Sequence, residues 1–322
     1  MKFFYDKIIP FISNEEINIV DVGARNGFSL FSEDLTKYCN LHSFEPNPSE
    51  FTKLIEQKTD LQLSGAILPK FKDNKYYKIA LSNTKGTSEF YITNGPGACN
   101  LMGDTNKKVT ENMFLDVNKK TSYEKEHVNI KEKILVETET LDDLFNKTKI
   151  DFLKVDAEGM DYYVLEGAKK LLNNKKILLI KTEVIFFSHF TKFTPILGDQ
   201  MCLMRDLGYR CIDLDLNHSG YLCKDTEYPI SSDRRPKYAG DAYFVPDFDN
   251  YDFSQNDLIR LALVLSGVGY YSLSKFFLKK ANILSNNLLD GLFKDIHKIK
   301  YKKNFLYLWN FFPVWLKRKI FG

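Results

Sequence analysis

The sequence predicts an α/β protein, in which helices cover both faces of a mostly parallel β-sheet and a C-terminal α-helical extension follows. Short apolar segments alternate with helix-like segments, which is the pattern of a parallel sheet. Most of the apolar segments end in a polar residue, as strands that deliver side chains to one edge of a sheet do. After Pro246 the alternation stops and only helix-like segments follow.

The elements follow from this pattern in chain order. We expect strands at 17–22, 41–45, 76–80, 151–156, 177–184, 209–215 and 241–245. We expect helices at 48–58 and 162–172 and one that begins near Phe28. A Gly86 turn after the third strand predicts a hairpin partner for that strand. Residues 91–132 show no clear periodicity and are interpreted as a substrate loop or lid. In the extension, Ser254 is expected to cap a helix that ends before Gly267 and Gly269, and helices are expected at 271–284 and 288–303.

The 322 residues are long enough for a large core and for two domains, which we place at 1–248 and 249–322. Residues 250–322 carry a net charge of +8, whereas the whole chain carries +3, so the larger part is mildly acidic. The five cysteines show no paired spacing, which favours a reducing compartment over disulfides or a zinc site. Neither a signal peptide nor a run of eighteen apolar residues is present, so we expect a cytoplasmic protein.

The stretch VDVGARNG predicts a ligand-binding turn at the end of the first strand. Gly23 and Gly27 allow a tight turn and a close approach of the backbone to a ligand. The stretch is neither a Gly-x-Gly-x-x-Gly fingerprint nor a P-loop, which favours a ligand without a pyrophosphate. By itself it is also compatible with a plain strand–helix turn.

Three further stretches place polar residues at strand ends. In SFEPNP, Glu45 ends the second strand about twenty residues after the glycine turn, where an acid holds the ribose hydroxyls in nucleotide-binding α/β folds. The third strand ends at Ala80, before SNTKG. In IDFLKVDAEGMDYYVLEGA, Lys154 and Asp156 straddle a strand end. Ligands of such sheets bind outside these carboxyl ends.

Together, DVGARNG, SFEPNP, ALSNTKG, TLDDLF, IDFLKVDAEGMDYYVLEGA and LLIKTEVIF resemble the FkbM-type methyltransferases in order and spacing, over about residues 17–246. The resemblance implies a Rossmann-like class I methyltransferase sheet and S-adenosylmethionine as the cofactor. Two features depart from the family. Arg25 stands in a turn where the family usually has Ala-Asn, and residues 96–132 are longer and more irregular than expected.

The resemblance also implies where the donor binds. Gly23 and Gly27 would meet its methionine part, Glu45 its ribose, and Ala80 and Leu81 its adenine, while Asp21 would contact its ammonium group or brace the turn. The full set of expected cofactor-binding residues is Asp21, Gly23, Ala24, Asn26, Gly27, Glu45, Pro46, Ala80 and Leu81.

An alcohol acceptor needs a base within reach of its proton, and Asp156, at the end of the central strand, is the leading candidate. Glu158, Glu183 and His189 are secondary candidates for a catalytic role. Alternatively, Asp156 holds the amino group of the donor or a divalent ion, although the sequence indicates no metal site. Glu158 could simply favour a helix start, and His189 could be a core histidine.

The function that we expect is S-adenosylmethionine-dependent O-methylation of a sugar hydroxyl in a glycan, glycolipid or related metabolite. The alternative is a non-catalytic protein of the same fold that assembles on membrane-bound glycan synthesis. The tail KKNFLYLWNFFPVWLKRKIFG combines cations with Trp309 and Trp315, which is typical of a segment in an anionic membrane interface, here the inner face, or of a helix docked on protein. An acidic body without a base-flipping motif argues against a nucleic-acid partner.

Overall fold

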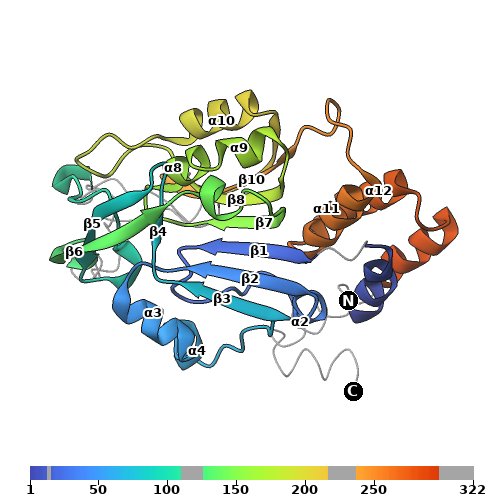
Figure 1. Cartoon of the computed structure of the whole chain (residues 1–322), viewed down its shortest axis with the longest axis horizontal. Coiled ribbons are helices and arrows are strands. Elements are labelled where there is room, and N and C mark those ends of the chain that lie inside the picture. The colour runs from blue at the N-terminus through green and yellow to red at the C-terminus, as the bar shows by residue number, and fades with distance from the viewer. Residues whose placement is uncertain (13–15, 110–125, 217–236, 297–322) are drawn as a thin grey trace, which may run out of the picture. The chain divides into compact units, whose positions relative to one another are not determined.

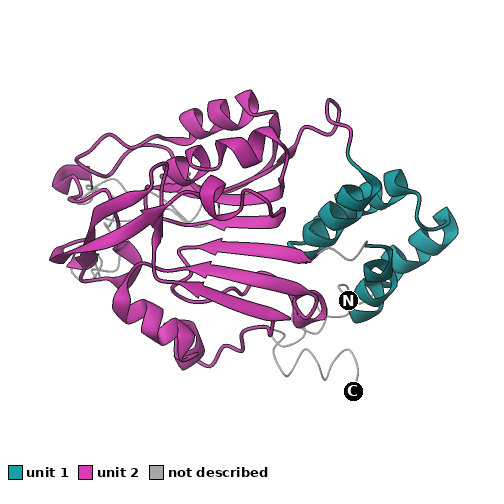
Figure 2. Ribbon diagram, in the orientation of Figure 1, with its two compact units in different colours: residues 1–15, 253–322 teal, residues 16–252 magenta. Residues whose placement is uncertain are grey.

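The structure, a computed structural model, describes residues 1–12, 16–109, 126–216 and 237–296. The chain divides into two compact units (Figure 2), residues 16–252 and residues 1–15 with 253–322. The sequence pattern assigned residues 1–15 to the first domain and put the boundary after residue 248. In the structure, the N-terminal residues belong to the unit that contains the C-terminal extension.

A seven-stranded sheet forms the centre of the larger unit (Figure 1), with the strand order β3-β2-β1-β7-β8-β10-β9. Six of the seven strands run in the same direction, and β10 runs in the opposite direction between β8 and β9. The parallel strands β3 to β8 therefore have the order 3-2-1-4-5 of a Rossmann-like sheet, which confirms the predicted fold class. The bounds are β1 Ile17–Val22, β2 Cys39–Phe44, β3 Asp73–Tyr77, β7 Ile150–Val155, β8 Ile177–Ile185, β9 Tyr209–Asp215 and β10 Ala239–Pro246.

The central strand β1 brings the predicted site residues to one place. It pairs with β2 on one side and with β7 on the other, so that Val22 lies opposite both Phe44 and Val155. Because these three strands are parallel and end in register, the residues that follow them meet at the same edge. This edge is also where the order of connection reverses, which is where ligands bind in such sheets.

Both faces of the sheet are covered. All six residues of β1 and of β2 are buried, as expected for strands between two layers. One face packs against α7 (Leu141–Leu144), α8 (Asp161–Glu166), α9 (Lys169–Asn173) and α10 (Leu197–Asp206) in one hydrophobic cluster. On the other face, the ring of Phe152 lies 5.9 Å from that of Phe28 and 5.0 Å from that of Phe31. A flanking pair of helices, α3 (Pro48–Ile55) and α4 (Asp60–Leu63), follows β2.

Two predicted helices were wrong in their bounds. No helix begins near Phe28, because the capping residue is Ser32 and α2 runs from Glu33 to Thr36 with both of its acids in the first turn. The helix expected at 162–172 is split into α8 and α9. At the break, a Cβ on Gly167 would lie 2.1 Å from the carbonyl oxygen of Ser82, and the carboxylate of Asp142 accepts the N–H groups that begin α9.

The strand predicted at 76–80 was also wrong. The edge strand β3 ends at Tyr77, and Ala80 begins β4 (Ala80–Leu81) of a second sheet with the order β4-β6-β5. The partner of β5 (Gly86–Thr93) is β6 (Ile130–Glu139), which the sequence pattern did not predict. The start of β3 was missed because Asp73, Asn74 and Lys75 are polar and exposed at the edge of the sheet.

The smaller unit is helical in its described part. It contains α1 (Lys2–Ile8), the 3-10 helix η1 (Ile9–Phe11), α11 (Gln255–Gly267), α12 (Tyr271–Ala281) and a helix over residues 286–296. Ser254 caps α11 by accepting the N–H of Asp257 at 3.1 Å, which confirms the predicted helix start. The hydroxyls of Tyr5 and Ser266 lie 3.2 Å apart and link α1 to α11. The predicted tail segment lies outside the described residues.

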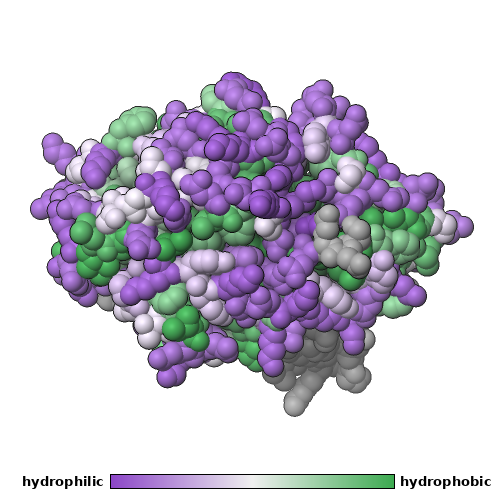
Figure 3. All heavy atoms as spheres, viewed as in Figure 1, coloured by the Kyte–Doolittle hydropathy of each residue, from purple (hydrophilic) through white to green (hydrophobic). Residues whose placement is uncertain are grey.

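The surface seen in Figure 3 is mostly hydrophilic, with hydrophobic side chains in small patches. Among the helices that the structure describes, none has the length and apolar content needed to cross a bilayer. The most exposed large apolar side chains are separate in sequence: Ile67, Phe193 and Leu135.

Candidate active site

The glycine turn after β1 is held against the ends of the two neighbouring strands. The N–H groups of Gly23 and Ala24 both donate to the carbonyl of Phe44, at 3.1 and 3.0 Å. Gly23 has φ +74°, and a Cβ there would lie 1.9 Å from the carbonyl oxygen of Asp156. Only glycine fits this position, because the backbone of β7 passes directly beside it.

A cavity of about 350 Å³ opens beside this turn, at the carboxyl ends of β1, β2 and β7. It is formed by the turn, by the residues after β2 and β7, by β4 and by the segment 96–101. Of the residues predicted to bind a cofactor or to act in catalysis, the following line it: Gly23, Asn26, Gly27, Glu45, Pro46, Ala80, Leu81, Asp156 and Glu158. Asp21 and Ala24 lie buried behind the turn, and Glu183 and His189 do not line the cavity.

Glu45 is the buried acid of the cavity. It follows β2, and its Oε1 accepts the N–H of Asn47 at 2.8 Å. Burial raises the pKa of Glu45 to about 7, although the bond from Asn47 opposes this rise. Asn47 in turn caps α3, because its side chain accepts from the N–H groups of Ser49 and Glu50. The position of Glu45 is therefore set by β2 on one side and by a capped helix on the other.

Lys154 links two of the predicted acids across the strand ends. Its Nζ lies 3.1 Å from Oδ1 of Asp21 and 3.3 Å from Oδ2 of Asp156. Burial opposes the charge of Lys154, but the two carboxylates outweigh burial and raise its pKa. Burial also raises the pKa of Asp21, which is 1% exposed and pairs with Lys154. Asp156 is half-exposed toward the cavity, so one of its faces remains open to a ligand.

Three more carboxyl groups, those of Glu158, Asp161 and Glu183, gather after β7 and near the end of β8. Burial, together with Asp156 and Asp161, raises the pKa of Glu158 to about 8. Burial and the carboxylates around it, Glu158 first among them, also raise the pKa of Glu183 well above its usual range. Glu158 has φ +48°, a left-handed conformation that is costly for a residue with a side chain and that often marks functional sites.

Asp161 holds the loop that carries Glu158. It is 3% exposed, and its Oδ1 accepts the N–H of Ala157 at 3.3 Å. Burial and the charge of Asp156 raise the pKa of Asp161 to about 7, against the effect of its bonds to backbone N–H groups. The sequence pattern gave no role to Asp161. An acid at the first position of a helix, five residues after a strand-end acid, was the available signal.

Residues 96–101 line one side of the cavity, and the residues that follow them bond to the loop after β8. Cys99 accepts a bond from Asn47 at 3.5 Å, and Asn100 exchanges backbone bonds with Tyr91. Further along, the N–H of Asn106 donates to the carbonyl of His189 at 2.7 Å. Burial lowers the pKa of His189 to about 4, so its ring is neutral. The irregular segment predicted at 91–132 is shorter in the structure, because residues 91–93 end β5 and residues 130–132 begin β6. Residues 110–125 of the predicted lid lie outside the described part.

Comparison with known families agrees with this architecture. Residues 21–211 match the family described as the methyltransferase FkbM domain, which is more than half of the chain. The protein therefore belongs to the FkbM methyltransferase family, as its motifs predicted. A comparison with curated proteins gave no match.

Several solved structures are similar in part. A TehB-like SAM-dependent methyltransferase from Corynebacterium glutamicum is 9% identical with a TM-score of 0.30, over 76% of this chain and 87% of that one. Magnesium protoporphyrin IX methyltransferase from Synechocystis, with bound SAM, is 8% identical with a TM-score of 0.31, over 76% and 79%. The TYW2 protein of M. jannaschii, in complex with AdoMet, is 14% identical with a TM-score of 0.25, over 76% of each chain. At these scores the likenesses carry no argument about the site.

Proposed function

We propose that this protein is an S-adenosylmethionine-dependent O-methyltransferase that acts on a hydroxyl of a sugar in a glycan, glycolipid or related metabolite. One observation carries the proposal: a single cavity at the switch point of the sheet contains the glycine turn, the buried acid Glu45 and the strand-end acid Asp156. Membership of the FkbM methyltransferase family supports methyl transfer as the reaction class.

The residues of the cavity fit the parts of the donor. Glu45 is positioned to accept the two ribose hydroxyls, because its second carboxylate oxygen is not used by Asn47. Ala80 and Leu81 offer an apolar wall for the adenine, beside Phe44. Gly23 lines the cavity and would meet the methionine part, and Asp156, which lines the same cavity and is half-exposed, is the acid that we assign to its ammonium group.

The donor supplies an activated methyl group, so the protein has to align the acceptor and to remove its proton. The sequence pattern placed Asp156 first as the base. In the structure Oδ2 of Asp156 pairs with Nζ of Lys154 at 3.3 Å, so part of this carboxylate is already engaged and less of it is open to a proton of the acceptor. Glu158 lines the same cavity and has a pKa raised by burial to about 8, close to the pH at which a general base is most effective. We therefore assign the base to Glu158 and the positioning of the donor to Asp156.

The choice of a glycan acceptor rests on the tail. The combination of cations with Trp309 and Trp315 is typical of a segment at an anionic membrane surface. Attachment there would bring the cavity near lipid-linked sugars. Among the described residues, no group of three or more His, Cys, Asp and Glu side chains is placed to hold a metal ion.

Calorimetric titration with S-adenosylhomocysteine tests the donor site. We expect Glu45→Ala to weaken binding about tenfold to a hundredfold, because hydrogen bonds to a charged group are lost. The matched control is Glu56→Ala, which removes an exposed acid that does not line the cavity and should leave the affinity within about twofold. Equal affinities of the wild type and Glu45→Ala would remove Glu45 from the ribose site.

A further inference from the structure

Arg25 is the residue of the glycine turn that departs from the family and that the proposed mechanism leaves without a role. It lines the donor cavity together with three acids, Glu45, Asp156 and Glu158, and one other basic residue, Lys154. The Nζ of Lys154 already pairs with two carboxylates. Arg25 is therefore the cation of the cavity lining that remains available to an anionic group of a ligand.

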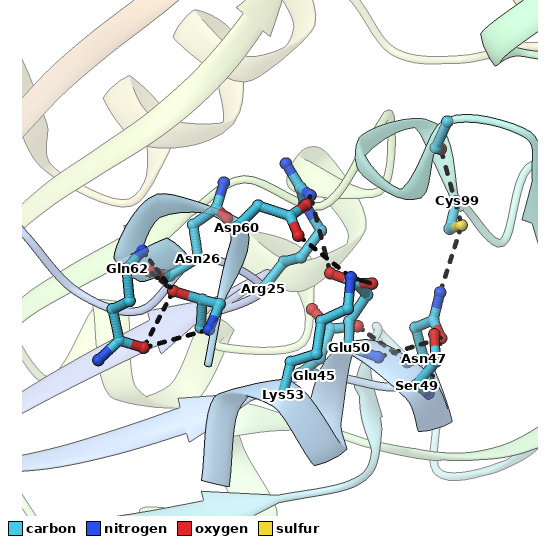
Figure 4. Close-up of polar contacts among 12 residues, drawn as sticks. Arg25, Asn26, Glu45, Asn47, Ser49, Glu50, Lys53, Asp60, Gln62 and Cys99 are labelled. Carbon is cyan, nitrogen blue, oxygen red and sulfur yellow. Dashed lines mark hydrogen bonds and ion pairs between the residues drawn. The ribbon is translucent and has the colours of Figure 1, made fainter. Parts of the chain in front are cut away.

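A charge network holds Arg25 in place from one side. The network consists of Arg25, Glu50, Lys53 and Asp60, whose side chains point toward one another in Figure 4. Nη1 of Arg25 lies 2.8 Å from Oδ2 of Asp60 and 3.7 Å from Oε2 of Glu50. Lys53 bonds both acids, at 2.8 and 3.1 Å. The positive charges of Arg25 and Lys53 balance the negative charges of Glu50 and Asp60. The network therefore holds the guanidinium of Arg25 against residues of α3 and α4.

The opposite edge of the guanidinium faces the cavity cover. Within the described part of the chain, both ion pairs of Arg25 use Nη1, which leaves Nε and Nη2 without an ionic partner. A Cβ built on Gly97 would lie 3.5 Å from Nη2 and 3.9 Å from Nε. Gly97 also lines the cavity. The absence of a side chain at Gly97 keeps this edge of Arg25 accessible.

We propose that the Nε–Nη2 edge of Arg25 is the subsite for the α-carboxylate of the methyl donor. The inference rests on the proposed function. Two parallel N–H donors match the two oxygens of a carboxylate, which is the arrangement that makes arginine–carboxylate pairs strong and directional. The network holds this fork in place before the ligand arrives, so little side-chain entropy is lost on binding. In this arrangement Asp156 binds the ammonium group of the donor's methionine part, and Arg25 binds its carboxylate.

Ligands that differ only in the carboxylate test the subsite. S-adenosylhomocysteine is compared with S-adenosyl-3-thiopropylamine, which lacks the carboxylate and keeps the amine, by calorimetric titration of the full-length protein. We expect Arg25→Gln to weaken S-adenosylhomocysteine about tenfold to a hundredfold and to change the affinity for the analogue by less than about threefold. Arg25→Lys keeps the positive charge but lacks the two parallel N–H donors. Its affinity for S-adenosylhomocysteine should lie between those of the wild type and Arg25→Gln.

The control is Lys58→Gln, which removes an exposed lysine that belongs neither to the network nor to the cavity lining and should change both affinities by less than about twofold. Equal loss for both ligands in Arg25→Gln and Arg25→Lys would overturn the subsite and show that Arg25 only shapes the turn. If the wild type binds neither S-adenosylhomocysteine nor 5′-methylthioadenosine, the donor proposal itself fails. If it binds them, and the ratio of the affinities for S-adenosylhomocysteine and S-adenosyl-3-thiopropylamine is the same in the wild type and the Arg25 variants, only the carboxylate subsite fails.

Discussion

Glu158 shows how the environment of one residue decides its chemistry. The sequence places it two positions after a strand-end acid, and that pattern alone ranks it below Asp156 as a base. The acids that raise its pKa, Asp156 and Asp161, are neighbours in sequence, but the burial that contributes most depends on how the loop after β7 folds, and Asp156 pairs with Lys154. No local pattern could reveal that balance.

The assignment of the base predicts a pH profile. Because the ionised form of Glu158 is the one that accepts a proton, the rate at saturating donor should rise as the pH increases through about 8. Glu158→Gln should lower this rate about a hundredfold to ten-thousandfold and remove the rise. The measurement is transfer of a labelled methyl group from S-adenosylmethionine, between pH 6 and 9, to the acceptor that supports turnover.

Asp156→Asn is the matched comparison. It should weaken donor binding and keep the rise but move it to lower pH, because Glu158 is still present and loses a neighbouring negative charge that helps to raise its pKa. A profile that loses its rise in Asp156→Asn and keeps it in Glu158→Gln would return the base role to Asp156. Loss of less than about tenfold in both variants would mean that neither carboxylate acts as a base.

At the level of elements, strands were easier to predict than their ends. The strands β1, β2, β7 and β8 are rich in buried apolar residues, and the sequence predicts their bounds within about two residues. The edge strand β3 was misplaced because its exposed start looks like a loop. The break between α8 and α9 was also missed, because it depends on the contact of Gly167 with Ser82, two residues that are far apart in the chain.

The pair β2–β3 carries a buried histidine whose titration affects stability. His42 on β2 is 7% exposed, and its Nδ1 lies 3.1 Å from the hydroxyl of Tyr77 on β3. Burial, followed by the charge of Lys75, lowers the pKa of His42 to about 4, so the unfolded chain binds the extra proton first as the pH falls. The stability associated with neutral His42 is present above pH 6.5 and is lost between pH 6.5 and 4.

Urea unfolding at pH 7 and pH 5 measures this effect. Between these values His42 should reduce the free energy of unfolding by about 2 kcal/mol, and His42→Gln should remove that part of the loss. Because other groups also titrate in this range, the comparison is between the two proteins at each pH. His127→Gln is the control at a histidine outside the central sheet. An identical pH dependence in the wild type and His42→Gln would contradict the buried, neutral state of His42.

At the scale of the whole molecule, the two ends of the chain differ in charge. Residues 250–322 carry +8, and the rest of the chain carries −5. The face shown in Figure 3 is mostly hydrophilic. We therefore expect any attraction to an anionic membrane to come from the basic, aromatic tail.

We expect the full-length protein to sediment with vesicles that contain anionic lipid at low salt and to be released as the salt rises. Each Lys or Arg near such a surface contributes roughly 1 kcal/mol, and salt screens this attraction. A version that ends at Lys303 should remain in the supernatant. Replacing Trp309 and Trp315 by Ser keeps the charge and should weaken binding through lost apolar burial, a test that does not depend on truncation.

Vesicles of neutral lipid are the control. If the full-length protein stays in the supernatant with anionic vesicles at low salt, the tail is no membrane anchor. If the shortened protein instead loses its thermal transition or changes its mass in solution, the tail stabilises this chain or a second copy.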